Sequence, residues 1–106
     1  MFIANSRFYV RAKDRRIFEE EWDAKTGFLF SQPGLLLFDL LRGPKAENRA
    51  LYVCHSVWKD KQSYLIWTSS ESYSKIHNNE QIKKFMLSEE PIIEAFEQVP
   101  FFDKAS

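Results

Sequence analysis

The sequence opens with a segment whose side chains alternate with a period of two. Across residues 2–10, odd and even positions would lie on opposite faces of an extended chain, and both faces carry apolar residues. Aromatic and β-branched side chains in the segment favour a strand. The pattern therefore predicts a strand over residues 2–10 with both of its faces covered.

The period then changes to that of a helix over residues 14–25. Phe18 and Trp22 can share one apolar stripe, while charged side chains point outward. Asp14 suits the N-cap position, and Gly27 follows as a stop signal. We expect an amphipathic helix that lays Phe18 and Trp22 against a sheet.

Two apolar runs come next, over residues 35–41 and 51–58. The first run is almost unbroken, and its length favours a strand buried on both faces. Gly43-Pro44 and a polar loop over residues 45–49 separate the two runs. The arrangement predicts two strands that pair as a hairpin.

Helical spacing returns in the second half of the chain. Asp60 suits an N-cap, and Ser69-Ser70 interrupts the pattern that follows it. The pattern predicts a helix through Trp67, a further helical segment through His77, a short helix over residues 81–87, and a strand over residues 92–99.

The predicted order of elements is β-α-β-β-α-β. This order is typical of a ferredoxin-like α+β fold, with an antiparallel sheet and helices on one face. We expect residues 1–106 to form a single domain. Because the other face of the sheet is also apolar, we expect a second copy to cover it in a homodimer.

Composition narrows the choice of function. The chain has 106 residues, and 15 Lys+Arg balance 15 Asp+Glu, which argues against a general nucleic-acid partner. No segment approaches the ~20 apolar residues of a membrane span, and the first ten residues lack the pattern of a signal peptide. A lone cysteine, Cys54, excludes an intramolecular disulfide. We expect a soluble, cytoplasmic protein.

The unusual feature of the composition is its aromatic content, with 10 Phe, 4 Tyr and 3 Trp. Some of these rings could line a pocket for a flat ligand, and Trp67 suits either a pocket wall or ordinary core packing. His55 and His77 lack partners at metal-ligand spacing. Cys54 and His55 are adjacent in a strand, so they point to opposite faces and cannot act as a pair.

One set of residues resembles a known family. The run from Val57 to Gln62, followed by Trp67, Tyr73 and His77, resembles the heme-degrading monooxygenases of the antibiotic-biosynthesis-monooxygenase superfamily. The spacing of ten residues between the tryptophan and the histidine carries most of this resemblance, and the opening FIANSRF is similar to the family's first strand.

The resemblance implies roles for the residues of a heme site. His77 would be the proximal ligand of the heme iron, through a neutral imidazole nitrogen. Trp67 would pack against a distorted heme, and Trp22 and Tyr73 would contact it. The family's distal asparagine falls on Ser6 when Phe2 and Ala4 are aligned. Either Ser6 replaces this amide, or a local bulge turns Asn5 inward.

The function that this resemblance implies is oxidative opening of the porphyrin ring. Heme would serve as cofactor and substrate, O2 as oxidant, and a reductase or small reductant as electron donor. Two copies would form a dimeric α+β barrel. Two alternatives remain open: a cofactor-independent monooxygenase of aromatic or quinol substrates, and a non-catalytic heme-binding protein.

Overall fold

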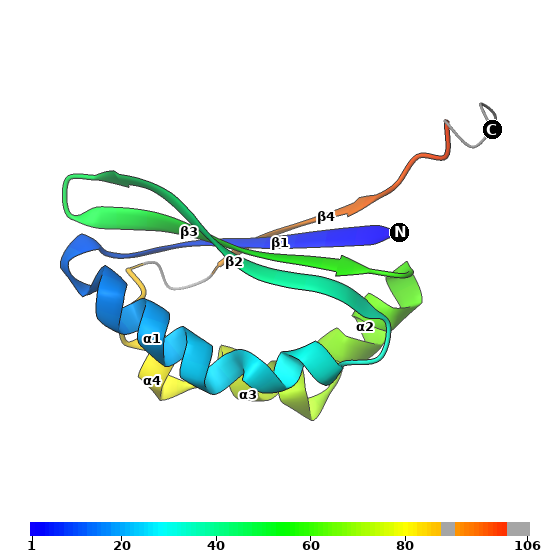
Figure 1. The fold of residues 1–106 in the computed structure, drawn as a ribbon, viewed down its shortest axis with the longest axis horizontal. Helices are drawn as coiled ribbons and strands as arrows, with labels where there is room; N and C mark the ends of the chain where they lie inside the picture. Colours follow the sequence, from blue (N-terminus) through cyan, green and yellow to red (C-terminus); the bar gives the residue numbers. More distant parts are fainter. Residues whose placement is uncertain (88–90, 102–106) are drawn as a thin grey trace.

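A four-stranded antiparallel sheet forms the framework of the protein in the computed structural model, which describes residues 1–87 and 91–101 (Figure 1). The helices of the described residues all lie on one face of the sheet. The fold is therefore the α+β, ferredoxin-like arrangement that the sequence predicts. In chain order, the elements are β1 (Phe2–Arg11), η1 (Ala12–Asp14), α1 (Arg15–Thr26), η2 (Gly27–Ser31), β2 (Leu35–Ala46), β3 (Arg49–Trp58), α2 (Lys61–Thr68), α3 (Glu71–His77), α4 (Glu80–Lys83) and β4 (Ile92–Glu97).

The strand order is β2-β3-β1-β4, so β1 and β3 occupy the centre of the sheet. The pairing of β1 with β3 runs without a break from Phe2↔Trp58 to Arg11↔Arg49. Alternation along β1 turns Phe2, Ala4 and Phe8 toward the helices, where they are buried. The sheet does not close on itself, because β2 and β4 are its two edges.

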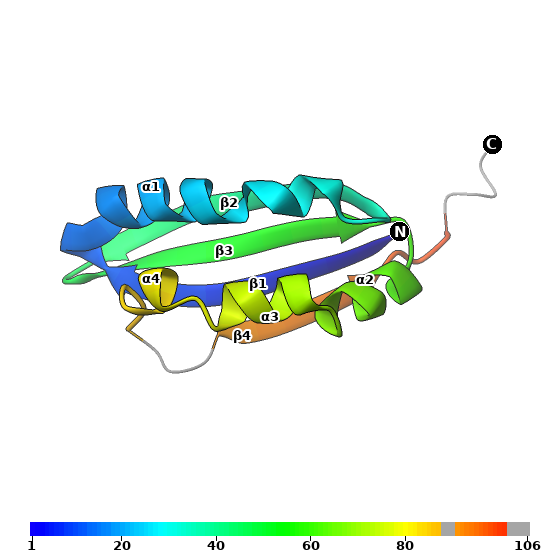
Figure 2. The ribbon, with the colours of Figure 1, turned by 90° about the horizontal axis from the view of Figure 1, so that it is seen from below.

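The helices form two rows across the covered face of the sheet (Figure 2). One row consists of α1 and η2 and runs along the β2 side. The other consists of α2, α3 and α4 and runs along the β4 side. The core between these rows and the sheet is rich in aromatic rings, and Phe18 and Trp58 are fully buried. The middle of the covered face therefore lies between two rows of helices.

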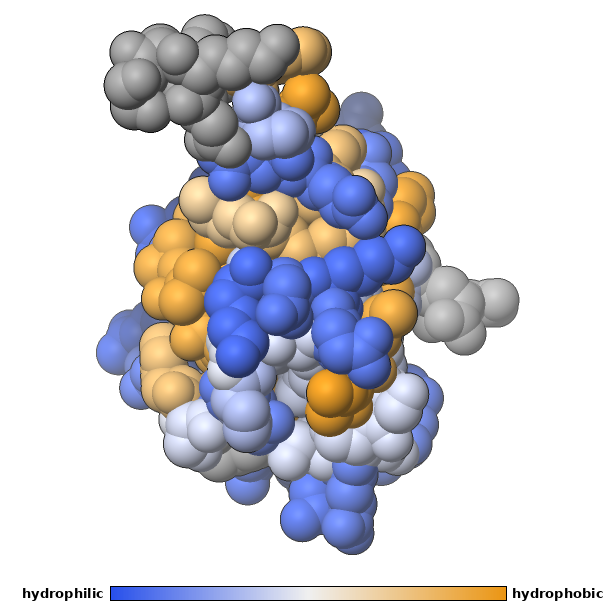
Figure 3. Space-filling model, turned by 90° about the vertical axis from the view of Figure 1, so that its right-hand side faces the viewer, coloured by the Kyte–Doolittle hydropathy of each residue, from blue (hydrophilic) through white to orange (hydrophobic). Residues whose placement is uncertain are grey.

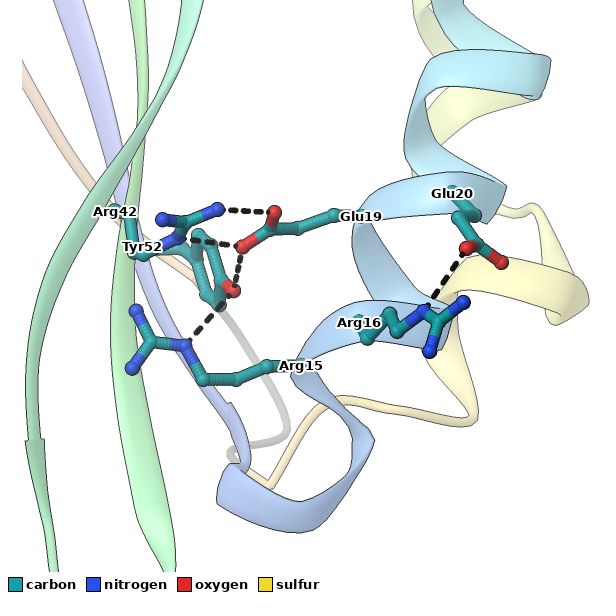
Figure 4. Close-up of polar contacts among 6 residues, drawn as sticks. All are labelled: Arg15, Arg16, Glu19, Glu20, Arg42 and Tyr52. Atoms are coloured by element: carbon teal, nitrogen blue, oxygen red, sulfur yellow. Dashed lines mark hydrogen bonds and ion pairs between the residues drawn. The ribbon is translucent and has the colours of Figure 1, made fainter.

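A polar clamp joins α1 to the sheet (Figure 4). Arg42 on β2 donates two hydrogen bonds to the Glu19 carboxylate on α1, at 2.6 and 2.8 Å. The Tyr52 hydroxyl on β3 also donates to Glu19, and Arg15 Nε donates to that hydroxyl. The bonds from Arg42 lower the pKa of Glu19 to about 2. The clamp holds the helix that carries Trp22.

The ends of α1 differ from the prediction. Asp14 occupies the N-cap position, but its carboxylate accepts a hydrogen bond from Arg11 Nε at 2.8 Å and caps no backbone N–H. Gly27 does not stop the helical path, because it has a helical φ of −55° and the chain continues into η2. A neighbouring arginine and a right-handed glycine therefore override the two sequence signals.

Two predicted strands and one helix also change length. β2 continues to Ala46 through Gly43-Pro44, with a register shift between Arg42 and Lys45, and the turn is reduced to two residues. β4 ends at Glu97, and the predicted helix over residues 81–87 is only the short α4. Strand pairing with β3 thus overrides the glycine-proline signal.

The uncovered face of the sheet is largely apolar and open to solvent in the single chain. The expected burial of residues 35–41 on both faces is wrong for this chain alone, because Leu37 and Leu41 are 45% and 46% exposed. Ile92 and Phe96 on β4 are more exposed still. Viewed from the end near α2, hydrophobic patches also interrupt the hydrophilic surface (Figure 3). Among the described residues, no helix is both long and apolar enough to cross a membrane.

Candidate active site

A cavity of about 200 Å³ lies between the two helical rows and the sheet, since residues of both rows and of the sheet line it. Residues of β1 and β3, together with Phe38 of β2 and Ile93 of β4, form its floor, and residues of α1, α2, α3 and α4 form its walls. The cavity brings together residues that the sequence singles out, namely Ser6, Trp22, Trp67, Tyr73 and His77. Asn5 also borders it.

Trp67 is held between other rings in the wall of the cavity. Its indole stacks on Trp58 with ring centroids 5.2 Å apart, and Tyr73 meets it nearly at right angles at 4.8 Å. Its Nε1–H is buried and has no hydrogen-bond partner among the described residues. A buried donor without a partner costs about 1–3 kcal/mol. Because the atom is closed to solvent, a ligand could supply the missing acceptor only after neighbouring side chains move.

His77 ends α3 and also lines the cavity. Its ring lies against Tyr73, with centroids 4.0 Å apart. The chain has two histidines, and His55 belongs to the uncovered face, where its Nδ1 lies 2.7 Å from the Asn5 side-chain oxygen. His77 is therefore the imidazole that the cavity can offer to a ligand.

The choice between Ser6 and Asn5 follows from the register of β1. Ser6 pairs with Cys54, and the two residues border the cavity together. Asn5 pairs with His55 and directs its amide oxygen to that ring on the other face. Since β1 pairs with β3 without a register shift, no bulge turns the Asn5 side chain inward. Ser6 is the polar side chain that β1 presents to the cavity.

Cys54 and Ser56 on β3 also border the cavity, although the sequence predicts no role for either residue in a site. Both line the cavity floor, and burial raises the pKa of the Cys54 thiol to about 12. Strand alternation gave a usable signal, because Cys54 and Ser56 have the same parity as Trp58. Parity shows that Cys54, Ser56 and Trp58 share one face of β3, but only the pairing of β3 with β1 shows that this face borders the cavity.

The described residues that line the cavity include a positively charged side chain but no negatively charged one. Among the described lining residues, none is Asp or Glu, and Lys83 at the end of α4 is the single Lys or Arg. Arg7, by contrast, faces Glu94 at 3.8 Å on the uncovered side of the sheet. The wall therefore suits a ligand that carries negative charge or hydrogen-bond acceptors.

The described residues contain no group of three or more His, Cys, Asp or Glu side chains that could hold a metal ion. A single imidazole, such as that of His77, cannot replace such a group for a bare cation. It can complete the coordination of an iron whose other ligands come from a macrocycle. The donor set thus fits heme better than a free metal ion.

Comparison with known proteins identifies one family and several similar folds. A family model described as "Antibiotic biosynthesis monooxygenase" matches residues 1–79. None of the curated proteins matches the sequence. The fold is similar to that of MhuD from Mycobacterium tuberculosis, a heme-degrader solved with two hemes bound in its active site. The two sequences are 20% identical, and the TM-score is 0.72. The match covers 93% of this chain and 96% of the other.

Other solved structures with this fold have different descriptions. SnoaB from Streptomyces nogalater, a cofactor-independent oxygenase solved as a mutant, is 13% identical with a TM-score of 0.64, and 92% of each chain is covered. A conserved protein from Methanosarcina mazei is 11% identical with a TM-score of 0.69, again with 92% of each chain covered. At these identities, the likeness supports the fold alone.

Proposed function

Because the chain belongs to the antibiotic biosynthesis monooxygenase family, we propose that it is a heme-degrading monooxygenase. It binds heme in the cavity beneath the sheet, opens the porphyrin ring with O2 and electrons from a reductant, and releases the iron. The observation that carries this proposal is the position of His77, which shares the cavity with Trp67, Tyr73 and Trp22.

Each wall of the cavity supports a part of this proposal. His77 offers one imidazole nitrogen to the iron, and the aromatic walls offer flat apolar surface to the macrocycle. Lys83 offers positive charge to a propionate. A porphyrin is larger than the cavity of about 200 Å³. Binding must therefore leave part of the ring in solvent or displace the short helices α3 and α4.

Bound heme supplies the iron that activates O2 and the ring carbon that is oxidised. The residues of the chain bind and orient it. His77 holds one side of the ring, Trp67 limits its position from the wall, and Ser6 offers a hydroxyl donor from the floor. The apolar wall excludes water from the reacting centre.

Hemin titration of the purified protein tests the proposal. We expect a shifted Soret band that His77→Ala removes and that the matched variant His55→Ala on the uncovered face retains. Addition of O2 and ascorbate should then bleach the band, release iron and yield an open-chain tetrapyrrole by mass spectrometry. A Soret band that persists under these conditions would instead identify a non-catalytic heme-binding protein.

A second function, cofactor-independent oxygenation of an aromatic or quinol substrate, is favoured by the unpartnered Trp67 N–H. A phenol or quinone oxygen could accept this hydrogen bond once a neighbouring side chain moves to expose the nitrogen. A small aromatic ligand would fit the cavity of about 200 Å³. This alternative predicts no Soret shift with hemin, and O2 consumption with a quinol in the absence of added cofactor.

The active form that we propose is a homodimer. Leu37, Leu41, Ile92 and Phe96 lie on the uncovered face of the sheet and are exposed in the single chain. A second copy of the chain would bury this face, and two open sheets packed together would form the dimeric α+β barrel.

A further inference from the structure

We infer that Trp58 is a positioning residue for Trp67, and that Ser56 anchors it. Trp58 ends β3 and is fully buried. It is not among the described residues that line the cavity, whereas Trp67 is. Trp58 therefore influences a bound ligand through Trp67 and not by direct contact.

A chain of hydrogen bonds sets the orientation of the Trp58 ring. Its Nε1–H donates to Ser56 Oγ at 3.0 Å, and the Ser56 hydroxyl donates to the Ala4 carbonyl on β1 at 3.3 Å. Ser56 and Ala4 are direct cross-strand partners at the centre of the sheet. The ring of Trp58 is thereby tied to the most regular part of the fold.

Packing transmits this orientation to Trp67. The two indoles stack with an interplanar angle of 29°, and Tyr64 meets Trp58 edge-on at 5.9 Å. Tyr73 also meets Trp67 nearly at right angles, with ring centroids 4.8 Å apart. Contacts with both rings restrict rotation of the Trp67 indole and so favour one direction for its unpartnered N–H.

The first experiment uses the ligand-free protein, because two stacked indoles give an exciton couplet in circular dichroism. The chain has three tryptophans, so Trp58→Phe and Trp67→Phe should each abolish the couplet. Trp22→Phe should retain it, since the ring contacts of Trp22 are with Phe8 and Phe18. We expect Ser56→Ala to lose most of the couplet and Ser56→Thr, which keeps the hydroxyl, to restore it.

The second experiment measures turnover and rests on the proposed function. We expect Trp58→Phe to lower the rate of hemin degradation about tenfold, with little change in the apparent Kd for hemin, because Trp58 does not line the cavity and only the orientation of Trp67 is lost. Unchanged turnover in Trp58→Phe, or an unchanged couplet in Ser56→Ala, would overturn the inference. If Trp58→Phe does not fold, the couplets of the ligand-free Ser56→Ala and Ser56→Thr variants decide, because Ser56 itself lines the cavity.

The two experiments test the proposed function and the positioning role of Trp58 separately. A wild-type protein that binds no hemin would defeat the proposed function. The couplet of the ligand-free protein would still show whether Trp58 and Ser56 hold Trp67 in place.

Discussion

At the scale of single residues, Lys83 supplies positive charge to the lining of the cavity. It is the single Lys or Arg among the described residues that line the cavity. We expect Lys83→Gln to weaken hemin binding about threefold to tenfold, because one partly solvated ion pair to a propionate is lost. Absorbance titration measures this change.

Lys84→Gln is the matched control for Lys83. Lys84 contacts Gln81 and the Phe85 ring and is not among the described lining residues. Its removal should leave hemin affinity unchanged. Equal losses in both variants would mean that only the general charge of α4 matters.

The Cys54 thiol provides a test of the cavity floor in the ligand-free protein. Because burial raises the pKa of the Cys54 thiol to about 12, very little of the thiol is ionised at pH 8, and the thiolate is the reactive form. We expect alkylation of the native protein at pH 8 to be far slower than that of the denatured chain, and to accelerate as the pH rises toward 10. Rapid native labelling at pH 8 would contradict a shielded, neutral Cys54.

Some residues of the candidate site could be predicted from the sequence, because a local pattern along the chain identifies them. The parity of Phe2, Ala4 and Ser6 put Ser6 on their face but left a bulge that would turn Asn5 inward as an alternative, and the unbroken register of β1 with β3 shows no such bulge. Other features depend on atoms from distant segments. The missing partner of Trp67 and the shielding of Cys54 follow from the packing of β1, β3 and α2, which no local pattern encodes.

At the scale of elements, the turn before β2 depends on one glycine. Gly34 has φ +82°, and a Cβ there would clash with the Ser63 hydroxyl oxygen at the start of α2. We expect Gly34→Ala to lower the free energy of unfolding by about 1–3 kcal/mol, through backbone strain and this clash. Urea denaturation measures the change.

Gly27→Ala is the contrasting variant for Gly34. Gly27 has a helical φ of −55°, and a Cβ there meets nothing within 4 Å. Alanine should therefore stabilise the protein, by about 0.4–1 kcal/mol, because the unfolded chain loses freedom. Similar destabilisation by both substitutions would show that the two glycines are not distinguished by their backbone geometry.

The clamp between α1 and β2 should make stability depend on pH. Because Arg42 lowers the pKa of folded Glu19 from 4.5 to about 2, the clamp stabilises the fold fully above about pH 5 and loses this contribution as the pH falls toward 2. Solvent screening limits the effect, so Glu19→Gln should cost about 1 kcal/mol at pH 7 and much less at pH 2. Urea denaturation at both pH values measures it.

Glu20→Gln serves as the control for the clamp. Glu20 pairs with Arg16 at 3.5 Å on the exposed side of α1 (Figure 4). Its loss should change stability by only a few tenths of a kcal/mol at either pH. A larger effect of Glu20 than of Glu19 would refute the clamp.

Element types were predictable from hydrophobic periodicity, but their ends were not. Asp60 caps α2 as predicted, since its carboxylate accepts the Ser63 backbone N–H at 2.8 Å. Asp14 fails as a side-chain cap because Arg11 competes for the same carboxylate. Strand pairing likewise carries β2 past Gly43-Pro44. Each error reflects a partner from a neighbouring segment.

At the scale of the whole molecule, the uncovered face of the sheet predicts self-association. Leu37→Asp would place a charge in the proposed interface. We expect it to weaken the dimer more than about a hundredfold, because an unpaired charge would be buried. Sedimentation velocity over a range of concentrations measures the effect.

Ile66→Asp is the control for the interface. Ile66 is 62% exposed on α2, on the side of the sheet that bears the helices. The variant should sediment like wild type. A wild-type protein that remains monomeric at high concentration would contradict the proposed homodimer.

The chain order of the elements predicted the ferredoxin-like class, because β-α-β-β-α-β has few compact solutions. The expectation of strands covered on both faces could not be met by one chain. Leu37 and Leu41 carry the sequence signal of buried residues but are exposed here. The apolar run over residues 35–41 indicates that both faces of the strand are apolar, but it does not indicate what covers the second face.

The strand order also has a consequence for synthesis. β1 lies at the centre of the sheet, and one of its edges pairs with β4, so Phe2 meets Glu97 across that edge. During translation, β1 and β3 can pair while the other edge of β1 stays open until β4 emerges. An open edge next to an apolar face is a site where nascent chains can aggregate. Slow elongation between β3 and β4 should therefore lower the soluble yield of this protein.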